Sequence, residues 1–220
     1  MTRGIFVAGN ESALFSAAGV EAVKRVERFA AASISRDGTE AAESGDSRED
    51  PRRMTLDWNP GSPISARTLV LQAANKLEHI DDAVLVCVPP AYRRSVEGLF
   101  PADIDRLIDD NLKSWYFLVR ELLGAFRARQ AGTLALALLE TGQKSDAPDL
   151  TGPAVGAAFR AFARNVLLSA AGAPYTVLGF SCSEAGEENP FAAYIFKILD
   201  EEKKNSGKWY KYGKLGLFGR

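Results

Sequence analysis

Histidine and cysteine are scarce in this chain of 220 residues. It contains one histidine, His79, and two cysteines, Cys87 and Cys182. The chain therefore has too few of these residues for a disulfide scaffold, for a tetrahedral zinc cluster or for a mechanism that needs a histidine pair. We expect no metal site. His79 lies near the end of a predicted helix, where a contact with the negative end of the helix dipole is favoured over catalysis.

Long apolar runs and an excess of charge of either sign are also missing. No run reaches the roughly 18 uncharged apolar residues that a membrane span needs. The stretch "MTRGIFVAGNESALF" at the start lacks the long apolar segment of a secretory signal. The net charge is −1, which favours neither nucleic acid nor an anionic membrane as a partner. We therefore expect a cytoplasmic protein with no nucleic-acid and no membrane partner.

What the chain does contain is an alternation of short apolar runs with longer helical patterns. The runs favour parallel strands that are buried on both faces, so the sequence predicts an α/β fold: a three-layer, doubly wound, Rossmann-like single domain over 1–220, with a mostly parallel seven-stranded sheet. The strand-like runs cover 4–8, 30–34, 53–58, 82–88, 132–139, 175–181 and 207–219. The helical patterns cover 13–29, 64–78, 101–130, 151–167 and 191–204.

Two stretches stand apart from this alternation. Residues 35–53 are polar, charged and poor in large apolar groups, which predicts a solvated, mobile loop, with a docking segment as the alternative. The stretch "TGPAVGAAFRAFARNVL" at 151–167 predicts a helix that begins at a capping threonine. Its many small residues indicate close packing, and its first turns contain no acid, base or nucleophile.

Gly9 follows the first strand in "VAGNESALF", Asp57 follows the third in "LDW", and Asn111 lies in "DDNLKSW" on the longest helix. In these stretches the chain resembles the short-chain dehydrogenase/reductase family. "GTLALALL" is similar to the family's strand before its catalytic serine, and "GPAVGAAFRAFAR" to its Y-x-x-x-K helix. Position 139 lies 28 residues after Asn111, and position 152 lies 13 residues further on, as in the family pattern.

The resemblance implies a catalytic asparagine, serine, tyrosine and lysine, of which this chain retains only Asn111. Leu139 stands at the serine position, Gly152 at the tyrosine position and Gly156 at the lysine position. In the family the tyrosine transfers the proton, and the lysine lowers its pKa and holds the nicotinamide ribose. Glycine can do neither. We therefore expect no catalytic residues, and a local polar contact as the role of Asn111.

The resemblance also implies a glycine-rich cofactor turn, T-G-x-x-x-G-x-G, which is degenerate here. Ala13 and Phe15 replace the second and third glycines, and Glu11 adds a carboxylate where phosphate would lie. We expect the Phe15 ring either to fill the space of the dinucleotide or to push the helix away. No cofactor is expected, and Gly9, Asn10 and Asp57 remain only as vestigial cofactor-binding positions.

Other cofactor and substrate elements of the family are missing too. Cys87-Val88-Pro89-Pro90 stands in place of N-N-A-G, and Cys182-Ser183 in place of the Pro-Gly after the sixth strand. Arg36 could suit the 2′-phosphate of NADP, or it is a solvated arginine. The segment "CSEAGEENP" is too short for a substantial lid over a substrate.

Members of the family assemble through two long helices, which here are about 103–129 and 153–170. Both carry apolar residues on more than one face, which predicts a two-fold interface. These residues are Leu112, Trp115, Tyr116, Val119, Leu122 and Phe126 on the first helix, and Phe159, Phe162, Val166 and Leu167 on the second.

Three hypotheses about function follow. The first is a catalytically inactive member of the family that acts as a homodimer, a homotetramer or a structural partner of an active family member. The second is an NAD(P)H-dependent oxidoreductase of a small carbonyl or alcohol, with Cys87, Cys182, Ser183 and Tyr92 as candidate residues for a non-standard site. The third is a small-molecule sensor.

The two cysteines test the predicted strand order. They end the fourth and sixth strands, and the fifth strand between them would hold them about 10 Å apart, too far for a disulfide.

Overall fold

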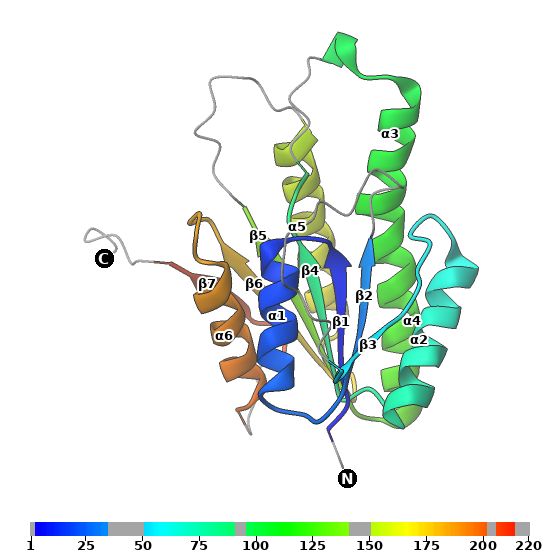
Figure 1. Ribbon diagram of the computed structural model, residues 1–220, viewed down its shortest axis with the longest axis vertical. Helices are drawn as coiled ribbons and strands as arrows, with labels where there is room; N and C mark the ends of the chain where they lie inside the picture. Colours follow the sequence, from blue (N-terminus) through cyan, green and yellow to red (C-terminus); the bar gives the residue numbers. More distant parts are fainter. Residues whose placement is uncertain (1–2, 35–50, 91–95, 141–150, 202–205, 214–220) are drawn as a thin grey trace.

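Seven parallel strands form one sheet in the order β3-β2-β1-β4-β5-β6-β7 (Figure 1). This computed structural model describes residues 3–34, 51–90, 96–140, 151–201 and 206–213. Every pairing between neighbouring strands is parallel, so the predicted α/β doubly wound sheet is confirmed, and it is parallel throughout. The strands are β1 (Ile5–Asn10), β2 (Phe29–Ile34), β3 (Arg53–Thr55), β4 (Asp82–Cys87), β5 (Thr133–Leu139), β6 (Thr176–Cys182) and β7 (Trp209–Tyr212).

The central strands are buried on both faces, which explains their continuous apolar runs. All seven residues of β5 are buried, and so are all six of β4. The edge strand β3 is shorter than predicted: of the run 53–58 it comprises Arg53–Thr55, and the Leu56 amide adds one hydrogen bond to Ala31 of β2. Arg53, the last residue of the predicted polar loop, therefore lies in a strand, while 35–50 of that loop lie outside the described residues.

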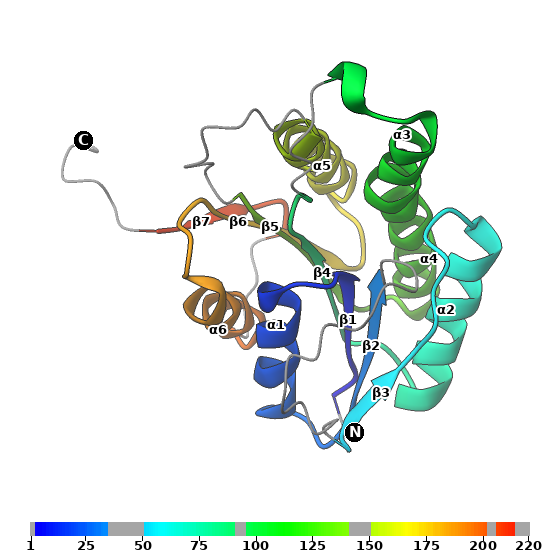
Figure 2. The ribbon, with the colours of Figure 1, turned by 45° about the horizontal axis from the view of Figure 1, so that its top comes forward.

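Helices cover both faces of the sheet, as Figure 2 shows. One layer, α1 and α6, packs over a core cluster that includes Phe29, Phe180 and Phe196, and the other, α2, α4 and α5, packs over a cluster that includes Trp115 and Phe159. The helices are α1 (Ala13–Val23), α2 (Pro63–Leu77), α3 (Pro101–Ile108), α4 (Ser114–Arg129), α5 (Thr151–Ser169) and α6 (Glu188–Leu199). A short 3₁₀ turn, η1 (Val96–Gly98), precedes α3, and a π-helical turn, η2 (Asp109–Lys113), joins α3 to α4.

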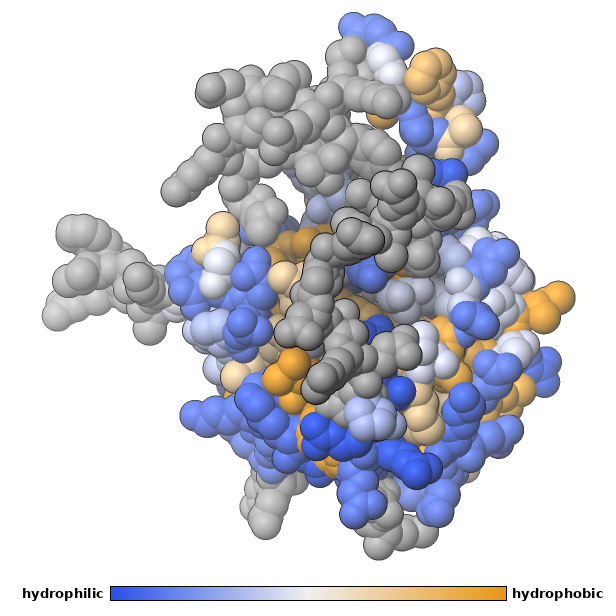
Figure 3. Space-filling model, in the orientation of Figure 1, coloured by the Kyte–Doolittle hydropathy of each residue, from blue (hydrophilic) through white to orange (hydrophobic). Residues whose placement is uncertain are grey.

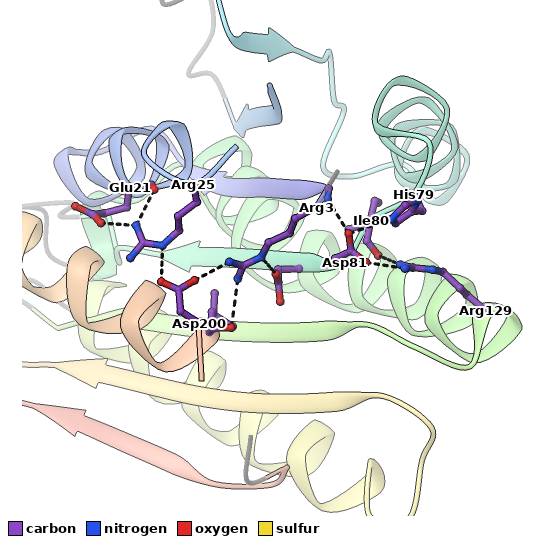
Figure 4. Close-up of polar contacts among 11 residues, drawn as sticks. Arg3, Glu21, Arg25, His79, Ile80, Asp81, Arg129 and Asp200 are labelled. Carbon is purple, nitrogen blue, oxygen red and sulfur yellow. Dashed lines mark hydrogen bonds and ion pairs between the residues drawn. The ribbon is translucent and has the colours of Figure 1, made fainter. Parts of the chain in front are cut away.

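A network of ion pairs ties the chain together at the amino ends of the strands (Figure 4). Arg3 contacts Asp82 at 2.5 Å and Asp200 at 2.6 Å, and Arg25 joins the same Asp200 at 2.7 Å. Arg25 also contacts Glu21 at 2.7 Å. The network connects β1, β4, α1 and the end of α6. It therefore fixes α1 and α6 against the sheet at the edge opposite the carboxyl ends of the strands.

His79 belongs to the same edge of the sheet, and its contact differs from the predicted one. Helix α2 ends at Leu77, and Glu78 adopts a left-handed conformation with φ of 67°. The chain then turns, and His79 Nε2 lies 3.1 Å from the carboxylate of Asp81, which also accepts a hydrogen bond from Arg129 at 2.6 Å. The partner of the imidazole is therefore a carboxylate.

The two cysteines confirm the strand order that the sequence predicted. Both are buried and unbonded, and β5 lies between them, since Cys87 pairs with Leu138 and Cys182 with Leu139. In the described part of the chain, no helix combines the length and the apolar character that crossing a bilayer requires. The same residues contain no cluster of three His, Cys, Asp or Glu side chains suited to a metal ion.

Candidate functional site

The positions that the resemblance implies gather at the carboxyl ends of the central strands. Asn10 ends β1, Cys87 ends β4, Leu139 ends β5 and Cys182 ends β6. Because the sheet is parallel, these ends lie on one edge, where a doubly wound fold places its ligands. The π-helical turn η2 and the start of α5 rise above this edge (Figure 1).

Asn111 lies in the π-helical turn and is nearly fully buried, with 3% of its surface exposed. Its side-chain Nδ2 donates to the carbonyl of Leu107 at 3.1 Å, and its Oδ1 accepts from Asn10 Nδ2 at 3.2 Å. Ser114 Oγ likewise donates to the Asp110 carbonyl at 2.5 Å. The two side chains thus pair with backbone carbonyls of α3 and of the turn, and Asn111 also connects the turn to β1. Asn111 therefore has the local polar contact that the sequence favoured.

The other three catalytic positions carry no group that could transfer a proton. Leu139 is 1% exposed and belongs to the core cluster under α1 and α6. Gly152 and Gly156 are both buried in the first two turns of α5. The described geometry thus brings these positions to the expected edge, but with apolar or absent side chains.

Pro89 and Glu140 lie beside Gly156. A β-carbon at this position would lie 3.4 Å from Pro89 Cγ and 3.5 Å from Glu140 Oε1. Glu140 follows the last residue of β5, and its carboxylate forms an ion pair with Arg160, one turn after Gly156 on α5. A half-buried carboxylate and a proline ring thus occupy the region into which a longer side chain at 156 would extend.

Arg160 is held from its other side by Trp209 of β7. The guanidinium lies 5.8 Å from the indole centroid, and Trp209 Nε1 donates to Oγ of the buried Ser181 at 2.9 Å. Gly179 makes this arrangement possible, because a β-carbon there would lie 2.3 Å from Trp209 Cε3. Sequence reasoning missed Glu140 and Arg160. The available signal was an acid directly after a strand, followed by an arginine on the next helix.

The turn after β1 shows why the first glycine persists and corrects one expectation. A β-carbon on Gly9 would lie 2.1 Å from the Val86 carbonyl oxygen, so strand packing alone requires glycine there. Of the two outcomes expected for Phe15, a ring in the dinucleotide space is wrong, because the ring is 3% exposed and packs in the core; the other, a displaced helix, stays a prediction. Arg53 lies over it, with its guanidinium carbon 5.4 Å from the ring centroid.

The same turn supplies its own cap. Ser12 Oγ accepts a hydrogen bond from the Phe15 amide at 3.2 Å and donates to the Asn10 carbonyl at 3.0 Å. One of the amides that an anion could use at the α1 N-terminus is therefore already paired. Glu11 is exposed in this turn. In the described surroundings Asn10 Oδ1 is buried without a hydrogen-bond partner.

The remaining cofactor positions contribute little. Asp57 is exposed after β3, and its neighbour Trp58 turns inward and packs edge-on against Trp115, with centroids 6.3 Å apart. Arg36 and Tyr92 lie outside the described residues. Between β6 and α6 there are five residues, 183–187, in agreement with the predicted absence of a substantial lid.

The thiols at the strand ends are poor acids. Burial, with a smaller contribution from the Glu140 carboxylate, raises the pKa of Cys87 well above that of a free thiol. Burial is also the largest cause of the raised pKa of Cys182, whose Sγ contacts the amide and the carbonyl of Glu184. Ser183, the other candidate of the oxidoreductase hypothesis, is exposed beyond the end of β6.

The two long helices expose less apolar surface than the sequence suggested. Tyr116 is 57% exposed and its ring lies tilted against that of Phe162, with centroids 4.5 Å apart, and Leu112 is half-buried. The other eight residues of the predicted interface lie in the core of a single chain, so they belong to the fold itself. They are Trp115, Val119, Leu122, Phe126, Phe159, Phe162, Val166 and Leu167.

Comparison with solved structures places the fold. A short-chain dehydrogenase from Mycobacterium smegmatis aligns with 98% of this chain and 94% of its own, at 14% identity and a TM-score of 0.75. A putative short-chain dehydrogenase/reductase family oxidoreductase from Aeromonas hydrophila aligns with 96% and 99%, at 15% identity and a TM-score of 0.75. ElxO with NADP bound aligns with 96% and 97%, at 10% identity and a TM-score of 0.72.

No protein-family model and no curated protein matches the sequence. At these identities the solved structures show the fold alone: a Rossmann-like fold of the short-chain dehydrogenase/reductase type.

Proposed function

Starting from this short-chain dehydrogenase/reductase type of fold, we propose that the chain is a catalytically inactive protein that acts by association. Its partner is a second copy of itself or an active family member for which it serves as a structural subunit. The observation that carries this proposal is the glycine at position 156, beside which Pro89 and the Glu140 carboxylate lie.

The chemistry at this place is opposite to what hydride transfer with a tyrosine and a lysine requires. The lysine position carries glycine, and the cation one turn later on α5, Arg160, is paired with the carboxylate of Glu140, the residue after β5. An arginine does not release its proton in proteins, so this pair offers no acid for a substrate alkoxide. Asn111 is engaged with Asn10 and the backbone, which leaves it a structural role.

The residues at the strand ends also fit a nicotinamide dinucleotide poorly. The ribose end would lack the lysine, and the phosphate end would meet Glu11 in a turn whose helix is capped by Ser12. The compared ElxO structure contains NADP, which is a property of that protein. For this chain we propose that neither NAD nor NADP is a cofactor.

Isothermal titration calorimetry with NADH and NADPH tests the proposal. We expect no saturable heat with either dinucleotide up to millimolar concentration. A dissociation constant in the micromolar range with one site per chain would overturn it. The matched variant is the double substitution Glu140→Ala, Arg160→Ala, which removes the ion pair beside Gly156 and leaves Pro89 in place. Binding that appears only in this variant would show that the ion pair excludes the ligand.

The alternative is an NAD(P)H-dependent oxidoreductase with a non-standard site, and it needs a proton donor near the strand ends. Cys87 and Cys182 are buried with raised pKa values, so neither exchanges a proton readily near neutral pH. Steady-state turnover by the wild type that disappears in Cys87→Ala would favour this alternative over the inactive protein.

A further inference from the structure

Helix α3 is amphipathic, yet none of its residues is buried. Phe100, which caps it, is 66% exposed, Ile104 is 44% exposed and Ile108 is 36% exposed. The three residues are four positions apart, so they share one face of the helix. A helix with such an apolar stripe normally faces a core or a partner. Figure 3 shows apolar side chains on the outer surface around α3. We name Phe100, Ile104 and Ile108 the α3 stripe.

The surroundings of the α3 stripe are acidic. Residues 97–113 contain five acidic and two basic side chains, whereas the whole chain is nearly neutral with a net charge of −1. One of the two bases, Lys113, is already paired with Asp109 at 2.6 Å. An occupant of the stripe should therefore combine large apolar side chains with positive charge.

Residues 214–220, "KLGLFGR", have this combination. They contain Leu215, Leu217 and Phe218 together with Lys214 and Arg220, and no acid. The wider stretch 203–220 contains six basic side chains and no acidic one. The segment therefore complements the α3 stripe in both apolar character and charge.

The topology favours contact between two chains over contact within one. The segment follows β7, the edge strand at one side of the sheet, whereas α3 leads into the helix layer over β4 and β5, on the far side of α5 (Figures 1 and 2). Seven extended residues reach at most about 25 Å, and docking uses up part of that length. Two copies can approach each other until the segment of one lies on the stripe of the other, and such an exchange forms two equivalent contacts about a two-fold axis.

We propose that residues 214–220 of one copy dock on the α3 stripe of a second copy. This deepens the association part of the proposed function and does not depend on whether a dinucleotide binds. The contact joins an apolar stripe rimmed by acids to an apolar segment with a base at each end, so added salt should weaken it.

Sedimentation velocity over a concentration series tests the proposal with four proteins. They are the wild type, Ile104→Asp, a chain that ends at Gly213, and the control Ile64→Asp, whose side chain is 77% exposed on α2. We expect a wild-type dimer, at least tenfold weaker self-association in the first two variants, and no change in the control. Phe100→Ser gives a second test of the stripe if Ile104→Asp fails to fold.

A fluorescently labelled peptide of residues 214–220 then identifies the occupant. We expect its anisotropy to rise on titration with the chain that ends at Gly213, and not when that chain also carries Ile104→Asp. A monomeric wild type, a dimer that truncation leaves intact, or a peptide that does not bind would each overturn the proposal. The calorimetric test of cofactor binding is unaffected by any of these results.

Discussion

Asn111→Ala is the substitution that best separates a structural asparagine from a catalytic one. It removes two hydrogen bonds of a side chain that is 3% exposed, and leaves the Leu107 carbonyl and the Asn10 amide without their partner. At about 1–3 kcal/mol for each buried group, and with Asn10 only partly buried, we expect a loss of about 2–4 kcal/mol in the free energy of unfolding. Urea titration followed by tryptophan fluorescence measures this loss.

Asn165→Ala is the matched control. Its Nδ2 donates to the Ala161 carbonyl at 2.9 Å, four residues back along α5, but the side chain is exposed. Both substitutions gain the same helix propensity, so we expect the control to remain within about 0.5 kcal/mol of the wild type. If Asn111→Ala destabilises the chain no more than this control does, the structural account of Asn111 is refuted.

A double-mutant cycle with Asn10→Ala isolates the contact between β1 and the π-helical turn. The two side chains share the 3.2 Å hydrogen bond. The sum of the losses in unfolding free energy of the two single variants should therefore exceed the loss of the double variant by about 1 kcal/mol. Additive losses would mean that the two asparagines act independently.

Three further predictions concern the site and its support. Gly156→Ala should stabilise the chain by about 0.5–1 kcal/mol, like the control Gly124→Ala, because its β-carbon would make only ordinary contacts; a destabilised Gly156→Ala with a normal control contradicts the described packing. Burial raises the pKa of Asp200, but Arg3 and Arg25 outweigh it and hold the pKa below the usual value. Its stabilising contribution is therefore present above the unfolded pKa of about 3.9 and lost as the pH falls through the folded value. The loss of stability as the pH falls from about 5 to about 2 should be smaller in Asp200→Asn than in the wild type, and an equal loss would be evidence against this network. The two buried cysteines should resist a thiol reagent at about pH 8 until denaturant is added, and rapid labelling of the native protein would show that they are accessible.

The sheet could be predicted because each buried strand is marked by a continuous apolar run of a few consecutive residues. A strand covered on both faces is apolar along most of its length, and β4 and β5 are apolar at every position after their first residues, Asp82 and Thr133. The edge strand β3 has fewer neighbours and a weaker pattern, so its extent was overestimated. The α3–η2–α4 region was predicted as one helix, because a single π-helical turn hardly disturbs helical periodicity.

The candidate site could be predicted only in part. The family spacing brought Gly156 to the strand ends, but it did not reveal that Glu140 and Arg160 would pair beside it. Which way a side chain turns after a strand depends on contacts that are distant in the sequence, here with Trp209. The same limit explains Phe15, whose ring packs inward, and the interface prediction, where a single chain already buries most of the apolar residues.

The central claim is that the strand ends beside Gly156 are closed to a dinucleotide by the protein's own side chains. The most direct measurement is the electron density of crystals soaked with NADPH. We expect an intact Glu140–Arg160 ion pair and no dinucleotide across the strand ends. A nicotinamide ring in density beside Gly156, with the Glu140 carboxylate displaced, would contradict the account.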